Sequence, residues 1–307
     1  MRRITHALLA SLVALVALTA LAACGGSSSS AADKALPKVS GGDFGSKPTV
    51  KSTGAQLTAL TKKVLKAGKG AEVKKGDLLV ADYLGQTWRN DKVFDNSYDR
   101  GQPAAFPIGV GQVVKGWDDT LVGLKIGSRV LLVIPPDKGY GTSGNTQAGI
   151  KGDDTLVFVV DIVATYAKDA ALTDATSVTP AAGQPKVTGA LGAKPSVVVP
   201  KGTVPPKAAS VTVLSRGTGP AVTDGELAVV EYEAVSWAGK AVDSTWGRVP
   251  QGFAISSQNP GPFLKLVGVP VGSRVLLLLP PQQGGKAATD SLAVAVDIVA
   301  VHGSSAK

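Results

Sequence analysis

Histidine and cysteine are almost missing from this chain of 307 residues, which contains two histidines and one cysteine. The histidines are His6, near the N-terminus, and His302, near the C-terminus. A Ser-His-Asp triad, a histidine general base and a histidine metal site are therefore excluded from the body of the chain. One cysteine allows neither a disulfide within the chain nor a cysteine-based zinc site. The sequence thus predicts no cofactor and no chemistry that depends on strong proton transfer.

Aromatic and charged residues are also scarce, at 5% and 18% of the chain. The 37 glycines and 19 prolines favour turns and linkers over long helices, so an all-helical protein is not expected. The net charge is +9, but the lysines are scattered, which indicates a solvated surface and no nucleic-acid partner. Attraction to anionic lipids or wall polymers is the alternative interpretation of this charge.

The N-terminus has the pattern of a secretory signal. Arg2 and Arg3 precede an apolar run, Ala7 to Ala23, which is shorter than the ~20 residues of a membrane span. The last four residues, Leu21 to Cys24, are similar to the lipobox of bacterial lipoproteins, in which the cysteine is lipidated. We therefore predict a signal peptide at 1–23, a lipidated Cys24 on a tether at 24–46, and a location on the outer face of the cell membrane.

Three sequence blocks occur twice in the same order, which indicates a duplicated domain. The pairs are 63–83 with 212–232, 123–136 with 268–281, and 156–164 with 292–300. The segment between the copies is rich in Ala, Thr, Pro and Gly and is typical of a linker. The predicted boundaries are a first domain at 47–167, a linker at 168–195, a second domain at 196–303 and a tail at 304–307.

Each copy contains mainly strand signals. In the first copy these are the β-rich runs at 77–85, 128–136 and 155–163, bounded by Gly, Asp or Pro. The run Gly116 to Leu124 is the one convincing helix, because Asp118 and Asp119 suit its N-terminal end and Trp117 and Leu121 share a face. The predicted fold class is α+β, with a mostly antiparallel curved sheet wrapped around one short α-helix in each copy.

Six aromatic residues of the first copy come from different predicted strands and loops. They are Tyr83, Phe94, Phe106, Trp117, Tyr140 and Phe158. In three dimensions they would form either a plain aromatic core or the lining of a pocket. Tyrosine and tryptophan carry polar tips that usually reach a partner or solvent, which favours a pocket. Asp95, directly after Phe94, is an awkward carboxylate unless it is paired or lies at a surface concavity.

The region from about Leu57 to Thr165 carries several motifs in a fixed order. They are Tyr83-x-Gly85, Phe94-Asp95-x-Ser97, Val114-x-Gly116-Trp117, Gly127-x-Arg129 and Tyr140-Gly141 before a flap. With these motifs the first copy resembles the FKBP-type peptidyl-prolyl cis-trans isomerases, the macrolide-binding immunophilins. The resemblance implies an enzyme that rotates X-Pro peptide bonds. This reaction moves no proton, which is consistent with the scarcity of histidine.

The resemblance also implies roles for individual residues. Trp117 would form the floor of a proline pocket, with Tyr83, Phe94 and Phe158 as walls. Asp95, held by Tyr83, would set the field near the twisting carbonyl, while the Tyr140 hydroxyl and the Val114 N–H would bind substrate carbonyls. Further substrate contacts would come from Phe106, Val113, Val114 and, in the flap, Ile150. Ala104 stands where the family often has an aromatic residue, so the affinity for macrolides stays open.

The second copy keeps framework positions but loses pocket positions. Tyr232 and Asp243 are retained, whereas Val242 and Val294 replace the two wall phenylalanines. The position of Tyr140 falls within 282–286, and the region of Trp117 reads Gly-Pro-Phe, ending at Phe263. We expect a retained fold without activity, unless Phe263 supplies a substitute floor.

The combined prediction is a monomeric, lipid-anchored isomerase that acts on X-Pro bonds of unfolded, secreted or envelope proteins, with macrolides as candidate inhibitors. Two alternatives belong to other functional classes. The first is a non-catalytic chaperone that binds unfolded chains with both copies, since two tethered weak sites gain avidity. The second is a structural protein that uses its basic surface at the wall or membrane, with salt-dependent binding.

Overall fold

The computed structural model describes residues 36–170, 172, 175–178, 183–281 and 290–303. The predicted signal peptide, Cys24 and the tail at 304–307 lie outside the described residues. Contacts divide the chain into two units, Met1–Leu36 and Pro37–Lys307. Within the described part, no helix is long and apolar enough to cross a membrane.

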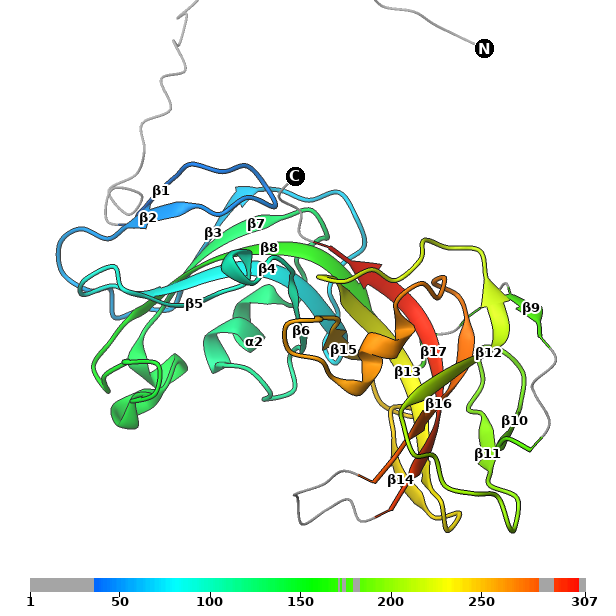
Figure 1. Ribbon diagram of the computed structural model, residues 1–307. Helices are drawn as coiled ribbons and strands as arrows, with labels where there is room; N and C mark the ends of the chain where they lie inside the picture. Colours follow the sequence, from blue (N-terminus) through cyan, green and yellow to red (C-terminus); the bar gives the residue numbers. More distant parts are fainter. Residues whose placement is uncertain (1–35, 171, 173–174, 179–182, 282–289, 304–307) are drawn as a thin grey trace, which may run out of the picture. The chain divides into compact units, whose positions relative to one another are not determined.

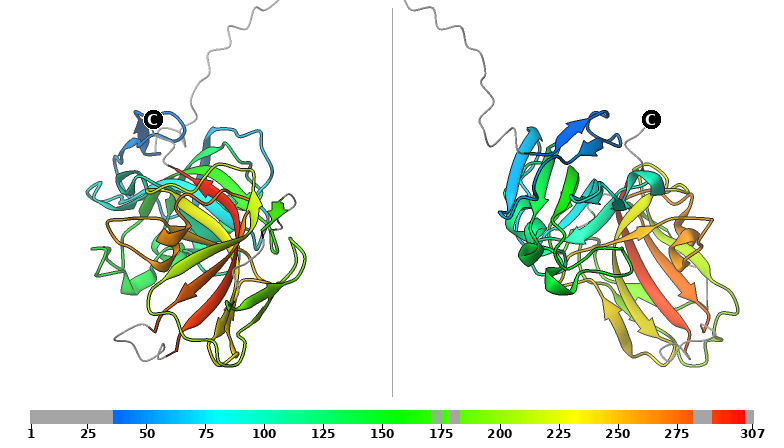
Figure 2. Two further views of the ribbon diagram at one scale, coloured as in Figure 1. Left: turned by 45° about the vertical axis from the view of Figure 1, so that its right-hand side comes forward. Right: turned by 90° about the vertical axis from the view of Figure 1, so that its left-hand side faces the viewer.

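The first copy forms an antiparallel sheet with the strand order β3-β7-β8-β4-β5 (Figure 1). These strands are β3 (Thr61–Lys66), β7 (Arg129–Ile134), β8 (Leu156–Tyr166), β4 (Leu78–Thr87) and β5 (Val93–Asn96). A short sixth strand, β6 (Ala104–Pro107), pairs with the first half of β4. The central strands β4 and β8 are long and strongly curved (Figures 1 and 2). The three strands predicted at 77–85, 128–136 and 155–163 are thus confirmed as β4, β7 and β8.

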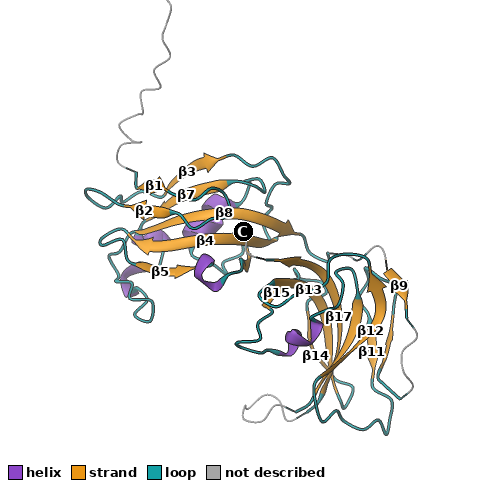
Figure 3. Cartoon of the chain, turned by 45° about the horizontal axis from the view of Figure 1, so that its top comes forward, coloured by secondary structure: helices purple, strands orange, loops and turns teal. Residues whose placement is uncertain are grey.

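One short α-helix, α2 (Lys115–Leu121), packs against this sheet and forms the core of the first copy with it (Figures 1 and 3). Trp117 and Leu121 are 3% and 0% exposed, so they form the buried face that their spacing predicts. The close approach requires glycine at position 116, because a Cβ there would lie 2.6 Å from Ile134 Cγ2. The remaining turns are the 3-10 helices η1 (Tyr98–Arg100), η2 (Pro136–Lys138) and η3 (Gly141–Ser143).

The second copy builds a sheet in which most strands have a counterpart in the first. The strands are β12 (Ser210–Gly217), β16 (Arg274–Leu279), β17 (Leu292–His302), β13 (Leu227–Ser236), β14 (Ala241–Ser244), β15 (Gln251–Ala254) and β9 (Ala175–Ser177). Their order, β14-β13-β17-β16-β12, matches β5-β4-β8-β7-β3, and β9 extends the far edge. The register also matches, since Val294 pairs with Ala234 as Phe158 pairs with Gly85.

The prediction of an α-helix in the second copy is wrong. A 3-10 helix, η4 (Pro262–Leu266), takes its place. The preceding run contains Pro260 and Pro262, which have no backbone N–H to donate, and it leaves only five helical residues. Leu266 is nevertheless fully buried, so η4 still packs into the core of this copy.

A β-hairpin precedes each sheet, in segments whose composition suggested a tether and a linker. The hairpin of the first copy pairs β1 (Lys38–Ser40) with β2 (Thr49–Lys51), and that of the second pairs β10 (Lys186–Thr188) with β11 (Ser196–Val198). Strand β1 lies within the predicted tether and β10 within the predicted linker. The repeated structural unit is therefore longer than the repeat in the sequence.

A buried ion pair attaches the first hairpin to its sheet. Arg129 on β7 binds Asp161 on β8 at 2.6 Å, with both side chains almost fully buried. The same guanidinium donates to the backbone carbonyls of Gly42 and Ser46, in the turn between β1 and β2, at 2.5 and 2.7 Å. The turn returns a hydrogen bond from the Gly45 N–H to Asp161 at 2.7 Å. A charged group that would be costly to bury alone is thus fully hydrogen-bonded.

The second hairpin is attached in the same way. Arg274 on β16 binds Asp297 on β17 at 2.6 Å and donates to the carbonyls of Gly189 and Ala193, both at 3.0 Å. These acceptors lie between β10 and β11, as Gly42 and Ser46 lie between β1 and β2. The arginine and aspartate of each copy therefore have a defined structural role, which is to hold the hairpin on the sheet.

Candidate active site

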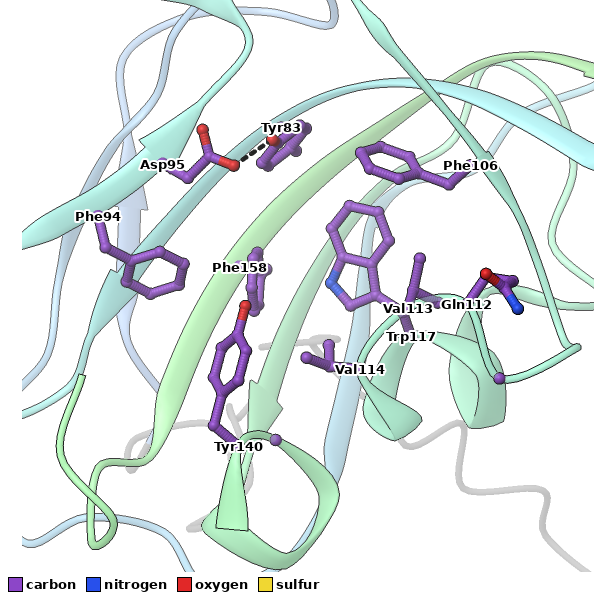
Figure 4. Close-up of a pocket in the computed structure, with 12 residues that line it drawn as sticks. Tyr83, Phe94, Asp95, Phe106, Gln112, Val113, Val114, Trp117, Tyr140 and Phe158 are labelled. Atoms are coloured by element: carbon purple, nitrogen blue, oxygen red, sulfur yellow. Dashed lines mark hydrogen bonds between the residues drawn. The ribbon is translucent and has the colours of Figure 1, made fainter. Parts of the chain in front are cut away.

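A pocket of about 450 Å³ opens on the first copy, over α2 and between β5, β6 and β8 (Figure 4). Its lining combines aromatic rings with a few polar groups. The residues are Tyr83, Phe94, Asp95, Phe106, Gly111, Gln112, Val113, Val114, Trp117, Gly139, Tyr140 and Phe158. The structure therefore decides the alternative left open by the sequence, because the aromatic residues line a pocket as well as a core.

Trp117 is the centre of the aromatic cluster. Its indole makes edge contacts with Tyr83 at 5.5 Å and with Phe106 and Phe158 at 5.3 Å between ring centroids. Edge-to-face pairs at these distances are favourable and fix the ring orientations. The indole Nε1 is buried and has no hydrogen-bond partner among the described residues. Trp117 thus provides a rigid apolar surface at the base of the pocket.

The opposite wall consists of Phe94 from β5 and Phe158 from β8, which meet edge to face at 5.6 Å. Both rings lie directly over Gly85 on β4, which runs between the two strands. A Cβ on residue 85 would lie 2.5 Å from Phe158 and 2.9 Å from Phe94. Glycine at this position therefore allows the two rings to lie against the sheet.

The rim beside the helix is held by Asp118, in the first turn of α2. Its carboxylate accepts hydrogen bonds from the backbone N–H groups of Gly109 and Gly111 at 2.6 and 2.7 Å. These bonds fix the loop that presents Val113 and Val114. The N–H of Val114, the residue before the helix, donates to no described residue, as is usual at a helix N-terminus. It therefore remains a donor for a ligand.

The rim on the other side carries Tyr140, which is 38% exposed. Figure 4 shows its ring rising beside Phe158, with the hydroxyl directed toward the interior of the pocket. A phenolic O–H can both donate and accept a hydrogen bond. The pocket thus has an apolar floor, apolar walls and two separate hydrogen-bonding groups at its rim.

Three polar side chains meet at the far end of the pocket. The Tyr83 hydroxyl donates to Asp95, as predicted, and Arg100 binds Asp95 at 2.5 Å and the Tyr83 hydroxyl oxygen at 2.9 Å. Burial, together with the hydrogen bond to Asp95, raises the pKa of Tyr83 above its ordinary value of 10.0, although Arg100 acts in the opposite direction. Tyr83 is therefore a neutral donor at physiological pH, and Asp95 is an oriented acceptor.

The structure brings together nine of the ten pocket residues expected from the sequence and leaves out one. Ile150 lies in the flap, where its backbone pairs with Asn145, but its side chain is 3% exposed and packs into the core. Four contributors were missed, namely Arg100, Gly111, Gln112 and Gly139. Gln112 directly precedes Val113 and Gly139 directly precedes Tyr140, so proximity in the sequence was the available signal for both.

The second copy keeps the polar group. Tyr232 donates to Asp243, and Arg248 binds Asp243 at 2.6 Å. Burial alone would raise the pKa of Asp243, but the hydrogen bonds from Tyr232 and Arg248 hold it below its ordinary value. The arrangement of tyrosine, aspartate and arginine is therefore common to both copies and does not by itself distinguish an active site.

The aromatic part differs between the copies. Phe253 and Phe263 stack nearly parallel with 3.9 Å between their centroids, which is van der Waals contact and leaves no space for a ring between them. Val242 is 54% exposed and Val294 is buried, and both occupy the positions of the wall phenylalanines of the first copy. The second copy therefore has no aromatic wall at these two positions. The counterpart of Tyr140 falls at 282–286, outside the described residues.

No group of three or more His, Cys, Asp or Glu side chains suited to hold a metal ion occurs in the described part of the chain. The carboxylate that lines the pocket, Asp95, is already bound by Arg100 and Tyr83. The arrangement is suited to holding a small apolar ring and orienting the carbonyl groups beside it.

Comparison with known proteins places the similarity in the first copy. The family described as FKBP-type peptidyl-prolyl cis-trans isomerase matches residues 69–163. FK506-binding protein 2 of Dictyostelium discoideum is 45% identical over 92 residues, which are 30% of this chain and 68% of that protein. The FK506-binding protein of Streptomyces anulatus is 37% identical over 119 residues, or 38% of this chain and 96% of that protein. The solved structure of FkpA from Escherichia coli is 41% identical in sequence. The matched region covers 35% of this chain and 48% of the FkpA chain, with a TM-score of 0.32.

Proposed function

The chain belongs to the FKBP-type peptidyl-prolyl cis-trans isomerase family, and we propose that it isomerises X-Pro bonds in the pocket over Trp117. The observation that carries this proposal is the aromatic floor and wall of the pocket, with hydrogen-bonding groups at its rim and far end. This is the environment that a proline ring with two flanking amides requires. The substrates are proline-containing polypeptides.

The reaction rotates one peptide bond over a barrier of ~18–20 kcal/mol without breaking it. In the planar amide, resonance gives the C–N bond partial double-bond character, and the twisted amide has lost that resonance and part of its polarity. A pocket that binds the twisted form more tightly than the planar form lowers the barrier. Trp117 holds the ring, Tyr140 and the Val114 N–H hold neighbouring carbonyls, and the bound Asp95 carboxylate faces the rotating group.

We propose that the second copy retains the fold but does not catalyse. Its tyrosine, aspartate and arginine are in place, but Phe263 is stacked on Phe253 and both wall phenylalanines are valines. Polar groups alone provide no binding energy for an apolar ring. A tandem arrangement with one catalytic and one non-catalytic copy is the organisation that these differences support.

We further propose that the enzyme is a lipoprotein at the outer face of the cell membrane, acting on secreted or envelope proteins. The support is in the sequence, where an apolar run follows two arginines and ends in Leu-Ala-Ala-Cys at Cys24. Mass spectrometry of the mature N-terminus tests this proposal. A lipidated Cys24 as the first residue is expected, and a chain that still begins with Met1 contradicts it.

The relatives named as FK506-binding proteins suggest a macrolide as a second ligand class for the same pocket. We propose that FK506 competes with the proline substrate in the first copy. Inhibition of isomerisation by FK506, with weaker binding after Phe158→Val, is the expected result. Tight binding to the second copy would contradict the assignment.

The second copy provides the substitutions that test the site. Phe94→Val together with Phe158→Val gives the first copy the wall residues of the second, and we expect kcat/KM to fall about 100-fold, equivalent to ~2.7 kcal/mol of transition-state stabilisation. Near-UV circular dichroism confirms that the variant is folded. The matched control, Phe263→Ala in the second copy, leaves the rate unchanged.

The substrate for this assay is a short peptide with one X-Pro bond, and the protein is the full chain. If the double variant keeps the wild-type rate while Phe263→Ala lowers it, the assignment of activity to the first copy is wrong. If neither variant changes the rate, the aromatic pocket is not the site of catalysis.

A further inference from the structure

A line of three charged residues crosses the sheet of each copy at equivalent positions. In the first copy Asp82 on β4 is the register partner of Asp161 on β8, which is in turn the partner of Arg129 on β7. In the second copy the line consists of Glu231 on β13, Asp297 on β17 and Arg274 on β16. Each line places two buried acidic residues beside one arginine. The surplus negative charge needs either hydrogen-bond donors or a proton.

The first copy provides donors. The Ser97 hydroxyl donates to Asp82 at 2.8 Å, and the Tyr98 hydroxyl donates to Asp161 at 3.1 Å. Asp161 also accepts from Arg129. Both carboxylates of this line are therefore hydrogen-bonded.

In the second copy neither equivalent residue forms a well-aligned hydrogen bond to the line. Thr245 replaces Ser97, and its hydroxyl donates to the backbone carbonyl of Tyr232. Trp246 replaces Tyr98, and its indole Nε1 is buried without a partner among the described residues. Arg274 donates from Nε and Nη2 to the two carboxylate oxygens of Asp297.

Glu231 itself is completely buried, at 0% exposure. Neither of its carboxylate oxygens accepts a well-formed hydrogen bond from a described residue. An ionised carboxylate in this position is strongly unfavourable, whereas a neutral carboxylic acid is tolerated.

We propose that Glu231 is a proton-operated switch in the second copy, neutral when the sheet is tightly packed and ionised when the sheet loosens. The acidic groups around it are Asp297 on β17, Asp169 in the segment after β8, and Glu233 two residues along β13. The cations on this face are already engaged, Arg274 with Asp297 and Lys194 with Glu233 at 3.1 Å. Among the described residues, Glu231 thus faces negative charge on several sides and no unengaged cation.

The titration of this group agrees with its geometry. Burial raises the pKa of Glu231 from its ordinary value of 4.5 to about 7, and the negative charges of Asp169 and Asp297 add to the effect. The Thr245 hydroxyl and the Ala170 backbone act in the opposite direction. Because the pKa is raised in the folded state, the folded second copy binds this proton more tightly than the unfolded chain does. The contribution of Glu231 to stability is fully present below about pH 4.5 and is lost as the pH rises to about 7.

Hydrogen exchange of the full chain, followed by mass spectrometry at pH 5.5 and pH 7.5, measures this change locally. After correction for the intrinsic pH dependence of exchange, protection of the β13 and β17 amides should fall about 20-fold between these values, given a pKa that moves from 4.5 to about 7. Glu231→Gln, which mimics the protonated acid, should reduce the fall to less than about twofold. Peptides of the first copy are an internal reference.

The matched control is Glu233→Gln, which removes a carboxylate from the same face of the same strand and should keep the 20-fold fall. His302 also lies in this copy, and burial lowers its pKa, so it favours the folded state at higher pH. This opposing contribution is the same in wild type and Glu231→Gln and cancels in the comparison.

Carbon-13 NMR of the wild-type carboxyl groups provides a test that needs no variant. One glutamate resonance should titrate between about pH 6.5 and pH 7.5, far above the ordinary range. The proposal is overturned if every glutamate titrates below about pH 5.5, or if Glu231→Gln keeps the wild-type fall in protection.

Discussion

Gly85→Ala is the substitution that best tests how the catalytic pocket is built. The added Cβ would lie 2.5 Å from Phe158 and 2.9 Å from Phe94, whereas carbon atoms pack at about 3.5–4.0 Å. Phe158 must therefore retreat by about 1 Å, and Phe94 by somewhat less. Misplacing a binding group by this distance lowers catalysis by up to about 100-fold. We expect kcat/KM to fall between 10- and 100-fold.

The second copy shows that the glycine and the two phenylalanines depend on one another. Where its wall residues are Val242 and Val294, the position of Gly85 is occupied by Ala234, which is 5% exposed. Gly85→Ala combined with Phe158→Val should therefore recover the stability lost by crowding, about 1–3 kcal/mol, but not the activity. Recovery of stability without activity separates the pocket from the packing of the sheet.

The assay measures isomerisation of an X-Pro peptide together with urea unfolding of each variant. Ala234→Gly in the second copy is the matched control and should leave the isomerisation rate unchanged. An alanine at position 85 that keeps the full kcat/KM would refute the reasoning, because it would mean that the two rings do not have to lie against β4 for catalysis.

Three further predictions concern the polar groups. Arg100→Leu should lower kcat/KM about three- to tenfold at unchanged stability, since Asp95 and Tyr83 lose a shared donor, and an unaltered rate would show that the arginine is dispensable. Asp161→Asn should lower the free energy of unfolding by about 3–5 kcal/mol in urea, because Arg129 becomes an unpaired buried charge, and a loss below ~1 kcal/mol would contradict this. Because burial and Asp95 raise the pKa of Tyr83 above 10.0, the rate should stay constant between about pH 6 and pH 9, whereas a bell-shaped profile would indicate an unrecognised acid or base.

Much of the first copy was predictable because its signals are local. The β-rich runs around Leu79, Leu131 and Val159, bounded by Gly, Asp or Pro, define strands, and Trp117 with Leu121 defines the buried face of a helix. The family motifs then identify most of the pocket. The prediction that Ile150 contacts the substrate failed because neighbouring residues of a flap differ in the direction of their side chains. Some point into the core and others toward the pocket, and the sequence alone does not show which.

The hairpins and Arg100 show where sequence reasoning ends. Strands of three residues, such as Lys38–Ser40 and Lys186–Thr188, are too short to display a periodicity, and their glycine- and proline-rich surroundings are typical of linkers. They form because Arg129 and Arg274, far away in the chain, bind their turn carbonyls. Arg100 is a similar case, since a partly exposed arginine near an aspartate is ordinary on a protein surface.

The attachment of the hairpins determines where the chain can be divided for expression. A fragment that begins at residue 69, the start of the family match, lacks the carbonyls of Gly42 and Ser46. Arg129 would then keep Asp161 but lose two acceptors, and the freed surface of the sheet would be open to water and to other molecules. A stable excised enzyme should therefore start before Pro37, and an isolated second copy should start before Lys186.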